Sequence, residues 1–366
     1  MLPINDLSRH NGPLDAELRA AIDRVLRRGY YILGPENEAF ENEFAAYLGV
    51  AGTVAVGNGT DALELALRAL EIGPGDQVVT VANAGMYAST AIRAVGAEPR
   101  YVDIEARHML IDASQLERVA TPQTKAVIVT HLYGRMADVA AVLTFARRRG
   151  IKVIEDCAQA HGASRDGRRA GAWGDLAAFS FYPTKNLGAL GDGGAVVSND
   201  AGLLARLRSL RQYGWTSKYH VGMVGGRNSR LDELQAAVLR VKLPYLDGWN
   251  ERRRQVVRQY RSGLADLGWQ LPAEPGDDDV AHLCVMRCAE RDAVRAALGA
   301  AGIASDIHYP VPDHRQAGVA TPPQALPETE QAASTVLTLP CFPELEAPEV
   351  AVVIAALQQV AQRDQD

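Results

Sequence analysis

The feature that most limits the possible folds of this chain is an alternation of short apolar runs with helical patterns between about residues 50 and 200. The segment at 137–150, for example, repeats apolar residues at helical spacing and closes at Gly150. Such alternation predicts an α/β fold, with a large, mostly parallel sheet and helices on both faces. Ligands bind such sheets at the carboxyl ends of the strands. The predicted strands lie at 77–82, 100–105, 125–134, 152–160, 177–182 and 194–199.

The alternation stops near Pro244, and a long helical pattern follows it. Beyond that helix come a strand-like run at 279–288, a helical pattern at 290–302 and an apolar helix at 348–360. A chain of 366 residues is long enough for two domains. We therefore predict a large domain over 1–244 and a smaller C-terminal α+β domain over 245–366. The proline-rich piece at 320–330 is predicted to be a surface loop.

Charge and composition argue against several classes of function. A net charge of -6 disfavours a protein that binds the phosphate backbone of nucleic acids. No apolar run reaches bilayer length, and the N-terminal residues do not resemble a signal peptide. The four cysteines lack a paired CxxC spacing, so reduced, buried thiols are expected rather than metal ligands or disulfides. We expect a cytoplasmic protein with no metal, no nucleic-acid partner and no membrane partner.

One lysine, Lys185, stands among aromatic residues, a proline and glycines in the stretch SFYPTKNLGALGDGG (180–194). The chain has only five lysines, and most of its 38 basic residues are arginine. A lysine at this position is therefore notable, because an arginine would be the more common basic residue in this chain. A lysine partly removed from water has a lowered pKa and a nucleophilic amine, whereas an arginine stays charged. Lys185 is therefore a candidate to form a Schiff base with a carbonyl group. Taken in isolation, an ordinary surface lysine is the simpler interpretation.

A glycine-rich turn opens the helical pattern at 57–70, GNGTDALELALRAL. Free backbone N–H groups and the helix dipole favour a phosphate at such a turn, and Thr60 adds a hydroxyl. The turn is not a P-loop, because no GK[ST] follows it. Taken alone, the pattern is better explained by a capped helix that follows a strand.

A carboxylate, Asp156, follows the apolar residues of the strand predicted at 152–160, with Gln159 and His161 close behind. A buried carboxylate needs a cationic partner, because an unpaired buried charge is very costly. The partner is either a basic side chain or a cationic ring nitrogen on a ligand, whereas His161 alone is explained by packing. Together, the phosphate turn, Asp156 and Lys185 match the phosphate, pyridine nitrogen and aldehyde of pyridoxal 5'-phosphate.

The chain resembles the DegT/DnrJ/EryC1/StrS family of sugar aminotransferases over nearly its whole length. The family has the aspartate aminotransferase (type I) fold of PLP-dependent transferases, and the resemblance implies that fold, a pyridoxal 5'-phosphate cofactor and a homodimer with shared active sites. The resemblance rests on the order and spacing of eight motifs. These motifs are YYILGPENEAFENEFAAYLGV, GNGTDALELAL, GPGDQVVT, DCAQAHGA, SFYPTKNLGALGDGG, GRNSRLDELQAA, HYPVPDH and LPETEQAASTVLTLPCFPEL.

The resemblance implies roles for individual residues. Lys185 resembles the lysine that binds the cofactor's aldehyde, and Asp156 resembles the partner of the pyridine nitrogen. Gln159 matches a residue near the ring hydroxyl of the cofactor. One position departs from the family, since many members carry an aromatic residue that stacks on the cofactor where this chain has Gly85. Tyr87 is the candidate to stack in its place.

Further matches concern the phosphate of the cofactor. The family residues that contact this phosphate from the same chain match Gly59, Thr60 and Ser180. Asn228 matches an asparagine that reaches the phosphate from the neighbouring subunit. Asn228 is also predicted to cap the helix that follows it, and the two roles are compatible.

The segments at 207–219 and 308–314 resemble members that aminate the 3-keto group of a dTDP-linked 6-deoxyhexose. The resemblance therefore implies transfer of an amino group from L-glutamate, or from glutamine, to such a nucleotide sugar. His308, His314 and Tyr213 are then expected near the substrate. The alternative for the two histidines is that they only lie in a proline-rich loop.

Other functions stay open. Members that act on 4-keto sugar nucleotides or on cyclitol ketones have closely similar motifs. A few relatives are PLP-dependent sugar dehydratases in which histidine replaces the cofactor-binding lysine, and Lys185 argues against that group. A PLP-binding regulator without turnover would need a DNA-binding element, which neither the charge nor the length of the chain supplies.

Overall fold

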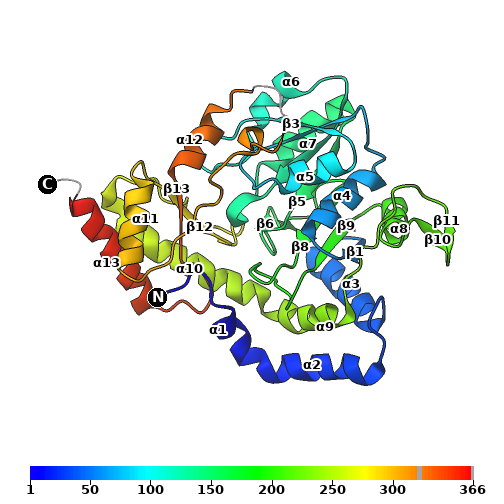
Figure 1. The fold of residues 1–366 in the computed structure, drawn as a ribbon, viewed down its shortest axis with the longest axis horizontal. Helices are drawn as coiled ribbons and strands as arrows, with labels where there is room; N and C mark the ends of the chain where they lie inside the picture. The colour runs from blue at the N-terminus through cyan, green and yellow to red at the C-terminus, as the bar shows by residue number, and fades with distance from the viewer. Residues whose placement is uncertain (320–323, 364–366) are drawn as a thin grey trace.

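A seven-stranded sheet forms the centre of the large N-terminal part of the molecule (Figure 1). The computed structural model describes residues 1–319 and 324–363. Only β9 runs antiparallel to its neighbours in this sheet, so the prediction of a largely parallel α/β sheet is confirmed. In spatial order the strands are β1 (Gly52–Val56), β9 (Gly194–Ser198), β8 (Leu176–Ser180), β5 (Lys152–Asp156), β4 (Thr124–Thr130), β2 (Gln77–Thr80) and β3 (Glu98–Tyr101).

Each of the six predicted apolar runs overlaps a strand, although β3 starts two residues earlier than predicted and β4 and β8 each start one residue earlier. Alternate residues of the strands face opposite sides, and both sides are buried. On one side Val78, Ile128 and Ile154 pack against α4 (Gly59–Ala69), α5 (Tyr87–Ala94) and α8 (Ala201–Leu210). On the other side, apolar strand residues pack against α3 (Pro35–Leu48), α7 (Val139–Arg149) and α9 (Glu233–Lys242).

A smaller unit follows, connected by the long helix α10 (Leu246–Leu264), which continues away from α9 (Figure 1). Its core contains residues of α10 and of β12 (Cys284–Arg287), α11 (Arg291–Ala300), β13 (Val336–Leu339) and α13 (Ala347–Arg363). Strands β12 and β13 pair antiparallel. The N-terminus also joins this unit, because Leu2 pairs with Ile303.

The remaining elements are short or lie at the N-terminus. The helix α12 (Pro327–Thr335) begins inside the proline-rich piece, so the prediction of a loop over 320–330 is wrong for its last residues, while 320–323 lie outside the described residues.

Within 1–319 and 324–363, no helix has both the length and the apolar character needed to cross a bilayer. The other elements are α1 (Leu7–Asn11), α2 (Asp15–Arg28), α6 (Leu116–Val119), β6 (Ser164–Arg165), β7 (Arg168–Arg169), β10 (Trp215–Ser217) and β11 (His220–Val221).

Candidate active site

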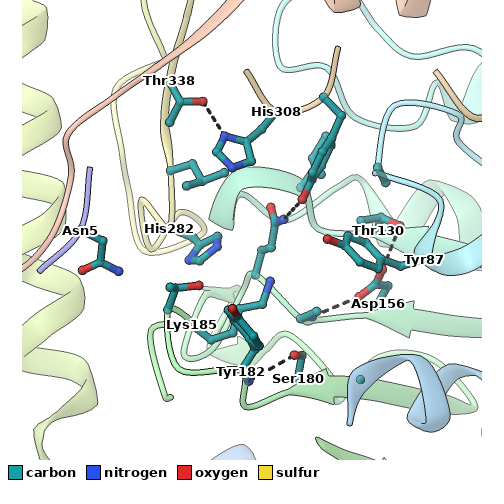
Figure 2. Close-up of a pocket in the computed structure, with 18 of the residues that line it drawn as sticks. Asn5, Tyr87, Thr130, Asp156, Ser180, Tyr182, Lys185, His282, His308 and Thr338 are labelled. Atoms are coloured by element: carbon teal, nitrogen blue, oxygen red, sulfur yellow. Dashed lines mark hydrogen bonds between the residues drawn. The ribbon is translucent and has the colours of Figure 1, made fainter. Parts of the chain in front are cut away.

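A cavity of about 580 Å³ lies at the carboxyl ends of the parallel strands, where the sheet meets the C-terminal unit (Figure 2). Strands β4, β5 and β8 each contribute their last residue, Thr130, Asp156 and Ser180. The C-terminal unit contributes the opposite wall. The predicted residues that line this cavity are Gly59, Thr60, Tyr87, Asp156, Gln159, Ser180, Lys185 and His308.

The turn after β8 presents Lys185 to the cavity. The backbone N–H of Lys185 donates to the carbonyl of Tyr182 at 2.8 Å, which closes the turn. Gly188 is required here, because a Cβ at that position would lie 2.3 Å from the carbonyl oxygen of Pro183. Burial lowers the pKa of Lys185 to about 8, while the negative charge of Asp156 acts in the opposite direction. The structure thus supplies the desolvated amine that the sequence predicts.

Asp156 is buried at the end of β5, with 5% of its surface exposed. One carboxylate oxygen accepts from the N–H of Ala158 at 3.1 Å, and the other from the hydroxyl of Thr130 at 3.4 Å. Burial raises the pKa of Asp156 above its usual range, against the effects of these bonds and of Lys185. No basic side chain in the described residues forms a salt bridge with Asp156. A cationic ring nitrogen in the cavity would supply the missing partner.

The first turn of α4 supplies an anion site beside Ser180. Asn58 caps the helix by accepting from the N–H of Asp61 at 2.8 Å. Gly59 is confined, because a Cβ there would lie 2.6 Å from the Cβ of Ser180. Thr60 and Ser180, which both carry hydroxyls, line the same cavity as the start of the helix. This arrangement fits a phosphate group.

Gln159 is fixed by two contacts that sequence reasoning missed. Its Oε1 accepts from the backbone N–H of Tyr133 at 2.6 Å, and its Nε2 donates to the hydroxyl of Tyr309 at 3.2 Å. The ring of Tyr309 also lies against Gly85, where a Cβ would be 2.9 Å from the ring. Gly85 has a φ of 78°, which favours glycine. The ring of Tyr87 lies at 6.1 Å from that of Tyr309, and its stacking on a cofactor stays a prediction.

Three comparisons with known proteins agree with this geometry. The sequence profile of the DegT/DnrJ/EryC1/StrS aminotransferase family matches residues 13–358. The chain belongs to this family. The predictions of the family and of an aminotransferase fold and activity are therefore confirmed.

The chain is 48% identical to the dTDP-3-amino-3,4,6-trideoxy-alpha-D-glucose transaminase of Streptomyces venezuelae, over 99% of this chain and 97% of that protein. Among solved structures, it is similar to S. venezuelae DesV in complex with a ketimine intermediate, with a TM-score of 0.95, 48% identity and 99% coverage of both chains. It is also similar to NtdA of Bacillus subtilis with bound cofactor PMP, with a TM-score of 0.92 and 31% identity over 99% of this chain and 85% of that chain. Membership of the family implies a pyridoxal phosphate cofactor.

Three predicted site residues lie outside the cavity of their own chain. His314 is buried, and its Nε2 lies 2.9 Å from a carboxylate oxygen of Glu330, so the expected position near the substrate is not observed. Tyr213 is 41% exposed and packs on Trp215. Asn228 is exposed and pairs with Gln212.

The prediction that Asn228 caps a helix is wrong, because α9 begins at Glu233 with Asp232 at its N-cap position. Tertiary contacts explain the later start. Asp232 pairs with Ile32 in an extended bridge, and the Glu233 carboxylate accepts from three N–H groups, those of Gly34, Glu36 and Asn37. The residues between Asn228 and Glu233 are therefore held in non-helical conformation.

Proposed function

We propose that this protein transfers an amino group from L-glutamate, or from glutamine, to a nucleotide-linked keto-deoxysugar. The observation that supports this proposal most strongly is that one cavity contains the amine of Lys185, the carboxylate of Asp156 and the anion site at α4. The substrate class rests on the relative from S. venezuelae, whose name specifies a dTDP-linked sugar with a 3-amino group. A dTDP-3-keto-6-deoxyhexose is therefore the proposed acceptor, and pyridoxal 5'-phosphate the proposed cofactor.

The residues of the cavity fit that cofactor. When bound, it supplies a carbonyl group and a protonated ring that withdraws electrons. Asp156 would hold the proton on the ring nitrogen, because no basic side chain among the described residues forms a salt bridge with its buried carboxylate. Thr60, Ser180 and the N-terminus of α4 would bind the phosphate. Gln159, fixed by Tyr133 and Tyr309, would orient the ring.

Lys185 would act as the general base that takes the proton from the α-carbon of glutamate, and as the general acid that delivers a proton to the ketone carbon of the sugar. Its pKa of about 8 lets the amine accept and release a proton close to neutral pH, which general acid–base catalysis requires. Glutamate and the sugar would use the same cavity in turn, in a ping-pong sequence. The keto acid formed from glutamate would leave before the keto sugar binds.

The test is an assay of the purified protein with glutamate or glutamine and a panel of ketones. The panel contains dTDP-linked 3-keto and 4-keto 6-deoxyhexoses and a cyclitol ketone, and formation of the amino product is followed. Turnover of the 3-keto sugar above the others is expected. Preference for the 4-keto sugar or the cyclitol would replace the proposed acceptor. Loss of the oxygen without amination would indicate a dehydratase, and absence of any exchange with either donor would favour a PLP-binding regulator.

We further propose that the active site is shared across a homodimer. Asn228, whose family counterpart contacts the neighbouring subunit's phosphate, is exposed and lies outside its own cavity. Tyr182 and Leu190, on either side of Lys185, are 52% and 44% exposed, and a second chain would cover such apolar surface. Two-fold symmetry would then give two identical sites, each built from both chains.

Complementation of two variants tests the shared site. Lys185→Ala and Asn228→Ala are purified separately, and the impairment of each is established. After mixing and reassembly, one site of a mixed dimer has both native residues, so activity should exceed that of either parent. Verified mixed dimers that regain no activity would show that Asn228 acts within its own chain.

A further inference from the structure

His282 lies in the cavity wall and belongs to none of the motifs that carry the family resemblance. It precedes β12, is only 6% exposed and lines the cavity. Figure 2 shows its ring near Lys185, on the side away from Asp156. Because Asp156 marks the place of the cofactor's ring nitrogen, His282 lies on the side where the amine of Lys185 would meet a substrate.

A chain of hydrogen bonds fixes the tautomer of His282. Asn250 donates its Nδ2 to the backbone carbonyl of His161 at 2.8 Å, so its Oδ1 is an acceptor. Asn186 donates its Nδ2 to that Oδ1 at 2.8 Å and to the carbonyl of Val280 at 3.1 Å. The Oδ1 of Asn186 must then accept from Nδ1 of His282, which lies 2.9 Å away.

The other ring nitrogen of His282, Nε2, is therefore a hydrogen-bond acceptor when the ring is neutral. Burial, followed by the positive charge of Lys185, lowers the pKa of His282 well below its usual value, so the ring is neutral at physiological pH. Nε2 has no hydrogen-bond partner among the described residues, and the amine of Lys185 forms no hydrogen bond with it. The cavity thus contains a buried acceptor of fixed orientation that is open to a ligand.

We propose that Nε2 of His282 accepts a hydrogen bond from a ring hydroxyl of the keto sugar, adjacent to the ketone. The inference rests on the proposed function, since it concerns the sugar that occupies this site. The ketone carbon must come within reach of Lys185, which brings the neighbouring hydroxyls to the same side of the cavity as His282. Glutamate presents carboxylates, which offer no proton to this nitrogen, and its single amine is the group that is transferred. The contact is therefore assigned to the sugar half of the reaction.

His282→Asn separates the two functions of the ring. The shorter amide retains an N–H that can donate to Asn186 but removes the acceptor at Nε2. Amino transfer from glutamate should stay within about twofold of the wild-type rate. For the sugar half-reaction, kcat/KM should fall by about 10- to 100-fold, the effect of losing one buried hydrogen bond. His282→Gln places an acceptor near the position of Nε2 and should restore part of the loss. His108→Asn, outside the cavity, is the matched control, and thermal unfolding verifies that each variant is folded.

Sugar analogues identify the hydroxyl. The sugar half-reaction is measured with dTDP-linked 3-keto-6-deoxyglucose and with its analogues that lack the 2-hydroxyl or the 4-hydroxyl. The glutamate half-reaction is measured separately. With one analogue, the wild type should lose activity and His282→Asn should cause little further loss. The proposal would be overturned if His282→Asn lowered activity equally with all three sugars or equally in both half-reactions. It would also be overturned if His282→Asn changed neither half-reaction. If the wild type accepts none of these sugars while it exchanges amine with glutamate, the proposed substrate fails, and the role of His282 fails with it.

Discussion

The pKa of Lys185 leads to a prediction about the loading of the apoenzyme with pyridoxal phosphate. Only the neutral amine attacks an aldehyde. With a pKa of about 8 instead of 10.5, about one-tenth of the amine is neutral at pH 7, roughly 300-fold more than for an ordinary lysine. Because burial lowers this pKa, the loading rate should rise about tenfold from pH 6 to pH 7 and level off above about pH 8.

The assay follows the absorbance of the bound cofactor after rapid mixing at each pH. The rates are divided by those of a simple amine, corrected to its neutral form, so that titration of the free cofactor cancels. Borohydride reduction and peptide mapping then assign the modified residue. Mapping is needed because burial also lowers the pKa of Lys242 to about 8, although its Nζ is buried and donates to the carbonyl of Gly188.

Asp156→Asn is the informative variant in this assay. Since the charge of Asp156 raises the pKa of Lys185, its removal should move the plateau to lower pH. Asp306→Asn is the matched control, because Asp306 lines the same cavity but is not among the charges that act on Lys185. A rate that keeps rising to about pH 10, or a label on another lysine, would refute the assignment of Lys185 as a desolvated amine.

Two further predictions concern the groups around Lys185. Asp156→Asn should slow the glutamate half-reaction by more than about 100-fold in a stopped-flow measurement, since it removes the charge proposed to hold the ring nitrogen protonated; a near-normal rate would leave Asp156 only a structural role. Gly85→Ala should reduce the free energy of unfolding in urea by about 1–3 kcal/mol, because the position has positive φ and the methyl would contact Tyr309. Gly75→Ala shares the positive φ but meets no atom within 4 Å, so an equal loss there would show that the ring contact contributes nothing.

The sequence predicted the part of the site that depends on local order along the sheet. Asp156 and Ser180 end neighbouring parallel strands, and strands of one direction place their ends at one edge. Lys185 follows in the next turn, and Thr60 begins the helix after β1. Periodicity predicted the strands that end at Asp156 and Ser180, whereas β1, which precedes Thr60, was not among the predicted strands. The turn at Thr60 was joined to the site because its chemistry matches the phosphate of the cofactor.

The residues that the sequence did not predict depend on contacts between distant segments. His282 becomes an acceptor only through Asn186 and Asn250, which come from the turn after Lys185 and from α10. Nothing in the local pattern around 279–288 distinguishes a histidine of fixed tautomer from one that only packs. The same limit explains why His314 was expected near the substrate but lies elsewhere, since its partner Glu330 is on the distant helix α12.

Gly85 and Tyr309 show why such pairs escape analysis of one sequence. Alone, Gly85 indicates a turn with positive φ, and Tyr309 indicates an aromatic residue in a proline-rich loop. In the structure the absent side chain of Gly85 leaves the space that the ring of Tyr309 fills, and the hydroxyl of that ring orients Gln159. A side chain from the C-terminal unit thus completes the wall of a cavity whose chemistry lies on the large sheet. Exchange of either residue should therefore alter the cofactor site through Gln159, although each lies in a segment whose own pattern indicates only a loop.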